Sequence, residues 1–207
     1  MNIALLPPYK KEICRKLIHL SSLWMPVALI ALGRENALVL FAVLLALLLA
    51  GEALMRSALP GGALLARIFG PVLRTHEAGK SGQLTGATWM VSSVIVCLIF
   101  FTVPVTVTAL CITLVSDTCA ALVGMKYGTP VFRGKSLEGT AAFTAAGYLT
   151  VMALSFVIPL PHQMAAGFLA VTVAAAVEFF SPMLRVDDNM GITLAAALTL
   201  WLAQGMM

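Results

Sequence analysis

An aspartate inside an apolar run is the residue of this sequence best placed to do chemistry. Asp117 follows a long stretch without charged residues and precedes a segment rich in Ala and Gly. A carboxylate at membrane depth costs roughly 2.5–3.5 kcal/mol on insertion scales, so it needs a partner or a function. Asp117 could bind a metal ion or accept a proton. The structural alternative is a protonated side chain that joins two helices by a hydrogen bond.

The segment after Asp117 carries groups that bind phosphate. They are glycines, cations and hydroxyls: Gly124, Gly128, Arg133, Gly134, Lys135, Ser136, Gly139 and Thr140. Glycines free backbone N–H groups, and the hydroxyls stand at the start of a predicted helix, where the helix dipole favours anions. The Gly-Lys-Ser triplet does not fit a P-loop, because five residues separate Gly128 from Gly134 where a P-loop has four. A basic loop that only sets membrane topology is the alternative.

Two further clusters lie near helix ends. Glu178, Asp187, Asp188 and Asn189 offer oxygen ligands of the kind that Mg²⁺ prefers. Solvated loop acids are the alternative.

Near the N-terminus, Glu12, Arg15, Lys16 and His19 stand at i, i+3, i+4 and i+7, which places them on one helical face. Membrane anchoring explains the Arg and Lys but leaves His19 unexplained. Thr85 is a predicted N-cap of the helix that begins at Gly86.

The composition requires these residues to lie in a membrane protein. Of the 207 residues, 60% are apolar and 11% are charged, against usual shares of about 45–50% and about 25%. This excludes an ordinary soluble enzyme, a disordered chain and a disulfide-rich secreted domain. The net charge of +4 does not indicate nucleic acid, because no basic run carries interleaved aromatic residues. The four cysteines form no CxxC pair, so neither a zinc site nor a disulfide framework is predicted.

The uncharged runs predict a single all-α domain over residues 1–207, a bundle of about seven transmembrane helices. The predicted helices lie at roughly 17–33, 36–58, 86–102, 104–124, 139–158, 162–181 and 189–206. The uncharged run 139–177 is expected to break at residues 159–162, where two prolines occur.

The charged residues predict the orientation of this bundle. With seven spans, every Lys and Arg except Arg34 falls on one side, which the positive-inside rule makes cytoplasmic, together with the N-terminus. Every acid except Glu35 lies at or near the same side. We therefore expect the site on the cytoplasmic face. The inner segment 57–85 includes an amphipathic stretch, Ala63 to Leu73, that is expected to lie in the membrane interface.

The motifs above occur in a particular order along the chain. They are Glu12-x-x-Arg15-Lys16-x-x-His19, Leu84-Thr85-Gly86-Ala87-Thr88-Trp89, Asp117-x-x-Ala120-x-x-x-Gly124-x-x-x-Gly128, Gly134-Lys135-Ser136-x-Glu138-Gly139-Thr140, and Glu178 with Asp188-Asn189. Over roughly residues 10–195 this set resembles the CTP-dependent lipid-alcohol kinases, which include dolichol, phytol and farnesol kinases and the fungal type of diacylglycerol kinase. The chain differs from that family at Ser116, where Gly is common.

The resemblance implies transfer of the γ-phosphoryl group of CTP to the hydroxyl of a membrane lipid at the cytoplasmic face. It implies catalytic roles for Asp117, Lys135 and Glu138, and Mg²⁺ held by Asp117, Glu178 and Asp188. The nucleotide-binding set that it implies is Arg15, Lys16, His19, Thr85, Gly124, Gly128, Arg133, Gly134, Ser136, Gly139, Thr140 and Asn189. The short chain resembles a compact prokaryotic enzyme of the cytoplasmic membrane.

Several alternatives stay open from the sequence. The acceptor is a polyprenol or dolichol, phytol, farnesol or diacylglycerol, since each presents one hydroxyl beside a hydrocarbon tail. A cytidylyltransferase that makes a CDP-lipid would also use CTP and a membrane lipid. A small carrier using Asp117 at depth is a non-enzymatic alternative, although such a carrier needs acids on a path to both faces. CTP is not distinguished from ATP by the residues, and the oligomeric state is open.

Overall fold

The computed structural model describes residues 8–57, 60–70, 83–158, 163–184 and 186–206. Nearly all of them are helical, which confirms the predicted all-α class. The elements in chain order are α1 (Pro8–Ser21), α2 (Trp24–Arg56), α3 (Pro60–Phe69), α4 (Gly86–Phe100), α5 (Val103–Tyr127), β1 (Pro130–Phe132), β2 (Lys135–Ser136), α6 (Leu137–Leu154), α7 (Gln163–Leu184) and α8 (Asp188–Met206).

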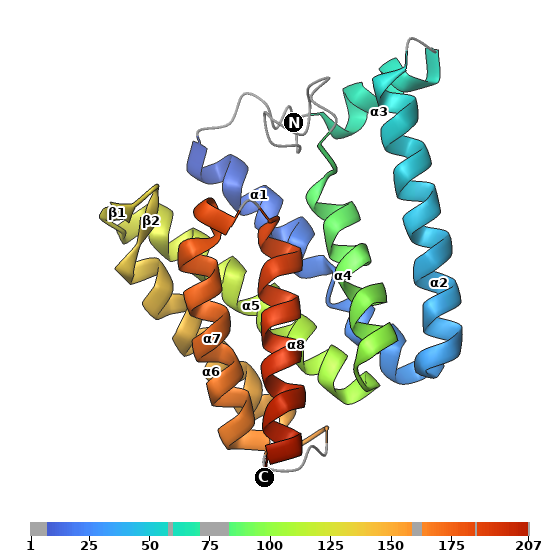
Figure 1. Ribbon diagram of the computed structural model, residues 1–207. Helices are drawn as coiled ribbons and strands as arrows, with labels where there is room; N and C mark the ends of the chain where they lie inside the picture. Colours follow the sequence, from blue (N-terminus) through green and yellow to red (C-terminus); the bar gives the residue numbers. More distant parts are fainter. Residues whose placement is uncertain (1–7, 58–59, 71–82, 159–162, 185, 207) are drawn as a thin grey trace.

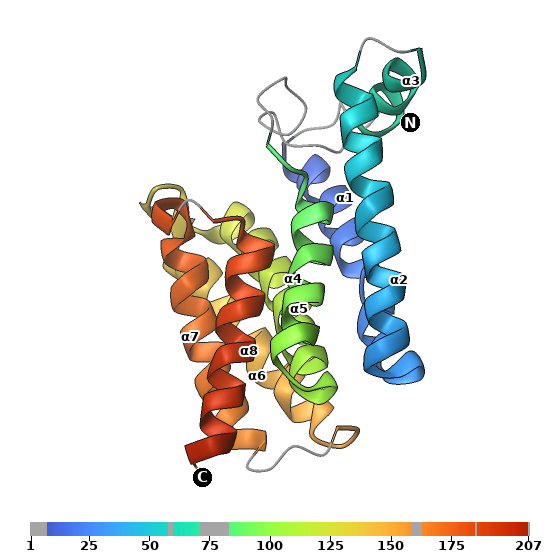
Figure 2. The same cartoon turned by 45° about the vertical axis from the view of Figure 1, so that its right-hand side comes forward.

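Four helical stretches among the described residues are long and apolar enough to cross a membrane. They are Tyr9–Arg56, Val103–Tyr127, Leu137–Leu154 and Met164–Leu184, and α4 is apolar but shorter. The first stretch has 48 residues, which as one straight helix would measure about 72 Å. It is interrupted at Gly33, whose φ of 71° suits a residue without a Cβ. Figures 1 and 2 show the chain running down through α1 and early α2 and returning upward along the rest of α2.

The start of the first predicted helix is wrong. The run 17–33 is divided, because α1 continues to Ser21 and a short turn precedes Trp24. The amphipathic segment expected at Ala63–Leu73 corresponds to α3, which begins at Pro60 and ends at Phe69. The predicted break at residues 159–162 lies outside the described residues.

Helix α5 forms the centre of the bundle, and its residues from Val105 to Leu114 are all buried. One apolar cluster joins α5 to α6, α7 and α8, and a second joins it to α2 and α4. Small residues allow close approach here: a Cβ on Gly147 of α6 would lie 2.6 Å from Val171 Cγ1 of α7. Figure 1 places the strands, α3 and the start of α1 at one end of the bundle, opposite the C-terminus.

Candidate functional site

Asp117 of α5 is paired with the face of α1 that the sequence singled out. Lys16 Nζ donates a hydrogen bond to Asp117 Oδ2, and His19 Nε2 lies 3.5 Å from the same oxygen. Lys16 is 4% exposed and Asp117 is 6% exposed. The pair compensates two charges away from water, which neither residue could tolerate alone. Arg15, the residue before Lys16, forms an ion pair with Glu12, with Arg15 Nη2 at 2.6 Å from Glu12 Oε1.

The segment that the sequence predicts to bind phosphate includes a short β-hairpin, which was not predicted. β1 and β2 pair antiparallel around a turn at Arg133 and Gly134, whose φ values are 44° and 88°. Two consecutive positive φ values define the type I′ turn that suits a two-residue hairpin. Phe132 stacks on Phe179 of α7 with ring centroids 5.7 Å apart, so the hairpin is fixed to the bundle.

Lys135 in β2 is held between two carboxylates. Its Nζ lies 2.5 Å from Glu178 Oε1 of α7 and 3.7 Å from Asp188 Oδ2 at the start of α8. Burial alone would lower the pKa of the Lys135 ammonium, but Asp188 and Glu178 outweigh burial and raise that pKa above its usual value. Lys135 is therefore a permanent cation at neutral pH.

Glycines allow the start of α6 to approach α5 closely. Ser136 is the N-cap of α6, and its Oγ accepts a hydrogen bond from Gly139 N at 3.1 Å. A Cβ on Gly139 would lie 3.1 Å from Ala120 O, and one on Gly128 would overlap Ser136 Oγ. The N-terminus of α6 is therefore held close to α5, and Ser136, Gly139 and Thr140 line one cavity together with Lys135. A helix N-terminus favours an anion.

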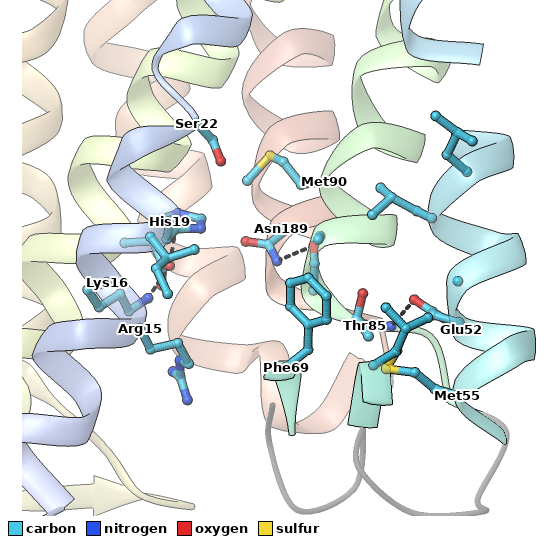
Figure 3. A pocket seen from close by; sticks show the side chains of 18 residues that line it. Arg15, Lys16, His19, Ser22, Glu52, Met55, Phe69, Thr85, Met90 and Asn189 are labelled. Carbon is cyan, nitrogen blue, oxygen red and sulfur yellow. Dashed lines mark hydrogen bonds and ion pairs between the residues drawn. The ribbon is translucent and has the colours of Figure 1, made fainter. Parts of the chain in front are cut away.

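Two cavities meet at the Lys16–Asp117 pair. A polar cavity of about 410 Å³ adjoins Lys135, Ser136, Thr140, Glu178 and Asp188. A mainly apolar cavity of about 490 Å³ lies between α1 and α2, with α4 behind it (Figure 3). Arg15, Lys16 and Asp117 line both cavities. These three residues form a charged partition between a site suited to phosphate and a site suited to hydrocarbon.

The polar cavity gathers most of the residues that the sequence nominated. They are Arg15, Lys16, Asp117, Gly124, Gly128, Gly134, Lys135, Ser136, Gly139, Thr140, Glu178 and Asp188. His19, Thr85 and Asn189 line the apolar cavity instead. In Figure 3, Arg15, Lys16 and His19 lie on the α1 side, across from Glu52 and Met55 of α2.

Arg133 and Glu138 line neither cavity. Arg133 occupies the tip of the hairpin turn, is exposed, and its Nη1 donates to Pro182 O at 3.3 Å. Glu138 is exposed, and its Oε2 accepts from Thr129 N at 3.2 Å. In this arrangement Arg133 and Glu138 fasten the hairpin to its neighbours, and neither faces the proposed phosphates.

Glu52 is a site residue that the sequence reasoning did not nominate. It is 4% exposed. Its Oε1 accepts from Thr85 N at 2.9 Å and from Thr88 Oγ1 at 2.5 Å. Thr85 caps α4 as predicted, since its side chain accepts from Thr88 N. The available signal was a lone carboxylate in the apolar run 36–58.

The described residues contain no group of three or more His, Cys, Asp or Glu side chains arranged to hold a metal ion by themselves. The predicted ligands Asp117, Glu178 and Asp188 instead face one cavity, each near a lysine ammonium. Mg²⁺ in phosphoryl-transfer sites is held by one or two carboxylates together with substrate phosphates and water. The donor set therefore fits Mg²⁺ arriving with a nucleotide, and does not form a preassembled protein cage.

Comparison with known proteins adds a relative without a described activity. The chain is similar to RP860, an uncharacterized protein of Rickettsia prowazekii (strain Madrid E), with 25% identity over 185 residues. The matched region covers 89% of this chain and 91% of that protein. No protein-family model and no solved structure matches the chain.

Proposed function

We propose that this protein is a CTP-dependent kinase that phosphorylates the hydroxyl of a membrane lipid alcohol. The observation that carries the proposal is the pair of adjoining cavities, one polar and one apolar, that share Arg15, Lys16 and Asp117. A lipid kinase must bring a charged phosphate donor and a hydrocarbon-bearing acceptor together at one point. A carrier that uses Asp117 would need acids on a path to both faces, and every acid except Glu35 is predicted at or near the cytoplasmic side.

The polar cavity suits the triphosphate. Lys135 supplies a fixed positive charge, and the N-terminus of α6 supplies backbone N–H groups beside Ser136 and Thr140. Mg²⁺, held by Asp188 and Glu178 together with the phosphates, would neutralise charge on the transferring group. Arg15 and Lys16 approach the same space from α1, so that three cations line the cavity together with the carboxylates of Asp117, Glu178 and Asp188.

The transfer needs little covalent chemistry from the protein. The lipid hydroxyl oxygen forms a bond to the γ-phosphorus while the bond from that phosphorus to the β–γ bridging oxygen breaks. CDP leaves with the electron pair of the broken bond. The hydroxyl proton passes to the Asp117 carboxylate and then to water, so the products are lipid phosphate, CDP and a proton. Lys16 is released from Asp117 to a phosphate oxygen in this step.

The topology proposed with this function has seven membrane spans and a cytoplasmic N-terminus. The helical stretches α1 to α2, divided at Gly33, and α4 to α8 supply those passes. The basic residues flanking them favour the cytoplasmic side for the end that carries the hairpin. The active site would then face the nucleotide pool across a prokaryotic cytoplasmic membrane.

The test is release of CDP by the purified protein in detergent with Mg²⁺ and CTP, against a panel of phytol, farnesol, a polyprenol and a diacylglycerol. We expect alcohol-dependent CDP release that is lost in Asp117→Asn and Lys135→Met. Ala50→Phe, an exposed position of α2 that lines neither cavity, serves as the matched control.

Two results would redirect the proposal. Release of pyrophosphate in place of CDP would identify a cytidylyltransferase. Absence of nucleotide turnover with every alcohol, in protein that melts cooperatively, would refute the kinase. Replacing CTP by ATP in the same assay decides the base preference.

A further inference from the structure

The wall of the apolar cavity that α2 forms lacks a side chain at Gly51. Gly51 lies on the same face of α2 as Leu47, Leu48 and Met55, and all four line the cavity. A Cβ built on Gly51 meets nothing within 4 Å. Glycine within a helix is less favourable than alanine by about 0.8–1.0 kcal/mol. No close helix contact among the described residues requires glycine here, so the unfilled space is the feature that Gly51 provides.

The cavity opens at apolar side chains. Ile18 of α1 is 51% exposed, Leu47 of α2 is 65% exposed and Phe69 of α3 is 51% exposed, although all three line the cavity. An opening with such a rim would bind water poorly and admits hydrocarbon. At the other end the lining becomes charged, at Lys16 and Asp117. The lining is also polar at Glu52 on the α2 side, but that carboxylate already accepts hydrogen bonds from Arg56, Thr85 and Thr88. Asp117 is the carboxylate of this lining that also lines the polar cavity.

We infer that this cavity binds a single hydrocarbon chain that ends in a hydroxyl, with the hydroxyl at Asp117, and that Gly51 provides the room for the chain. The inference rests on the proposed function and narrows its acceptor to single-chain lipid alcohols of the isoprenoid or fatty-alcohol type. The Lys16–Asp117 pair lies where this cavity adjoins the polar cavity, since both residues line both cavities.

The size of the cavity supports one chain over two. Its volume of about 490 Å³ lies in the lower half of the range of about 300–1,000 Å³ that holds one drug-sized ligand. A diacylglycerol carries its hydroxyl on a glycerol from which two acyl chains branch at once. Both chains would have to enter the mouth beside Gly51, and the glycerol esters would have to fit against the charged pair.

The experiment measures binding without requiring turnover. The protein is placed in nanodiscs of phosphatidylethanolamine and phosphatidylglycerol and labelled with a photoreactive diazirine analogue of hexadecanol. Unlabelled hexadecanol, dodecanol, phytol, hexadecane and dipalmitoylglycerol are used as competitors. Labelling is compared for the unchanged protein, Gly51→Ala, Gly51→Phe and the neighbouring control Ala50→Phe, whose position is exposed and outside the cavity.

We expect Gly51→Phe to weaken saturable labelling at least about tenfold, because each methylene excluded from an apolar site costs roughly fourfold in affinity. Gly51→Ala excludes about one methylene and should cost about fourfold at most. Dodecanol, which is shorter, should lose less affinity than hexadecanol in Gly51→Phe. Hexadecanol and phytol should compete, and dipalmitoylglycerol should not. Hexadecane should compete about tenfold more weakly than hexadecanol, because it lacks the hydroxyl that would donate to the Asp117 carboxylate.

Two outcomes overturn the inference: labelling that is equally strong in Gly51→Phe and Ala50→Phe, or competition by dipalmitoylglycerol equal to that of hexadecanol. Gly51→Ala keeps the test valid if Gly51→Phe does not fold. The two proposals fail separately. If the alcohol analogue labels the cavity as expected but no CDP is released, the kinase proposal is refuted and the inferred site for the hydrocarbon chain is retained. CDP release that is unchanged in Gly51→Phe keeps the kinase and refutes the chain site.

Discussion

Removing the Lys16 ammonium should destabilise the protein strongly, because it leaves a buried carboxylate without its principal partner. The side chains of Lys16 and Asp117 are only 5% and 9% exposed. Breaking such a buried pair from one side costs about 3–5 kcal/mol. His19 stays 3.5 Å from the carboxylate and offers partial compensation, so Lys16→Met is expected near the lower limit, about 3 kcal/mol. For a chain of this length, that loss lowers Tm by about 6–12 °C.

The assay is thermal unfolding in detergent, followed by far-ultraviolet circular dichroism, for Lys16→Met, Asp117→Leu and the double variant. The double variant replaces the ion pair by apolar groups, so we expect it to recover most of the lost stability but no kinase activity. A change in Tm below about 2 °C for Lys16→Met would refute the burial of the pair. So would a double variant whose loss equals the sum of the two single losses, because uncoupled residues behave additively.

Three other changes follow from the packing and charges. Gly147→Ala should lower Tm, because its Cβ would lie 2.6 Å from Val171 Cγ1. Ser116→Ala should raise the free energy of unfolding by about 1 kcal/mol, because Ser116 Oγ is buried without a hydrogen-bond partner among the described residues. Lys135→Met should destabilise the protein equally at all neutral pH values, by the same circular-dichroism assay. On the alkaline side, the raised pKa of Lys135 means that the stabilisation from its ion pairs is lost as pH rises above the ordinary lysine value of about 10.4. A loss that already fades near neutral pH would contradict this assignment.

The helices were located well from the sequence, because the hydropathy of a run and the backbone conformation at a glycine are both set by nearby residues. The uncharged runs gave helices close to α4 to α8, and Gly33 accounts for the reversal between the first two predicted spans. The hairpin was not predicted, because its two strands have only three and two residues and lie in a loop whose composition indicated only phosphate binding. Its Arg-Gly turn was the available signal.

The site was predictable as a set of residues and not as an arrangement. Lys16 and Asp117 are far apart in sequence, and no local pattern specifies that one lysine meets one aspartate across two helices. The turn geometry at Arg133 directs that side chain toward Pro182, while Lys135, two residues later, meets Glu178. Residue types alone therefore did not separate the cations that face the cavity from those that fasten the loop.

The shared wall of Arg15, Lys16 and Asp117 has a thermodynamic consequence. Any molecule that draws Lys16 away from Asp117 on one side alters the surface presented to the other side. The binding free energies of the two occupants are then coupled, and the coupling must be equal in both directions. If a nucleotide in the polar cavity tightens binding of an alcohol by some factor, the alcohol must tighten binding of that nucleotide by the same factor. Through this one ion pair, the affinity for each ligand would depend on whether the other ligand is bound.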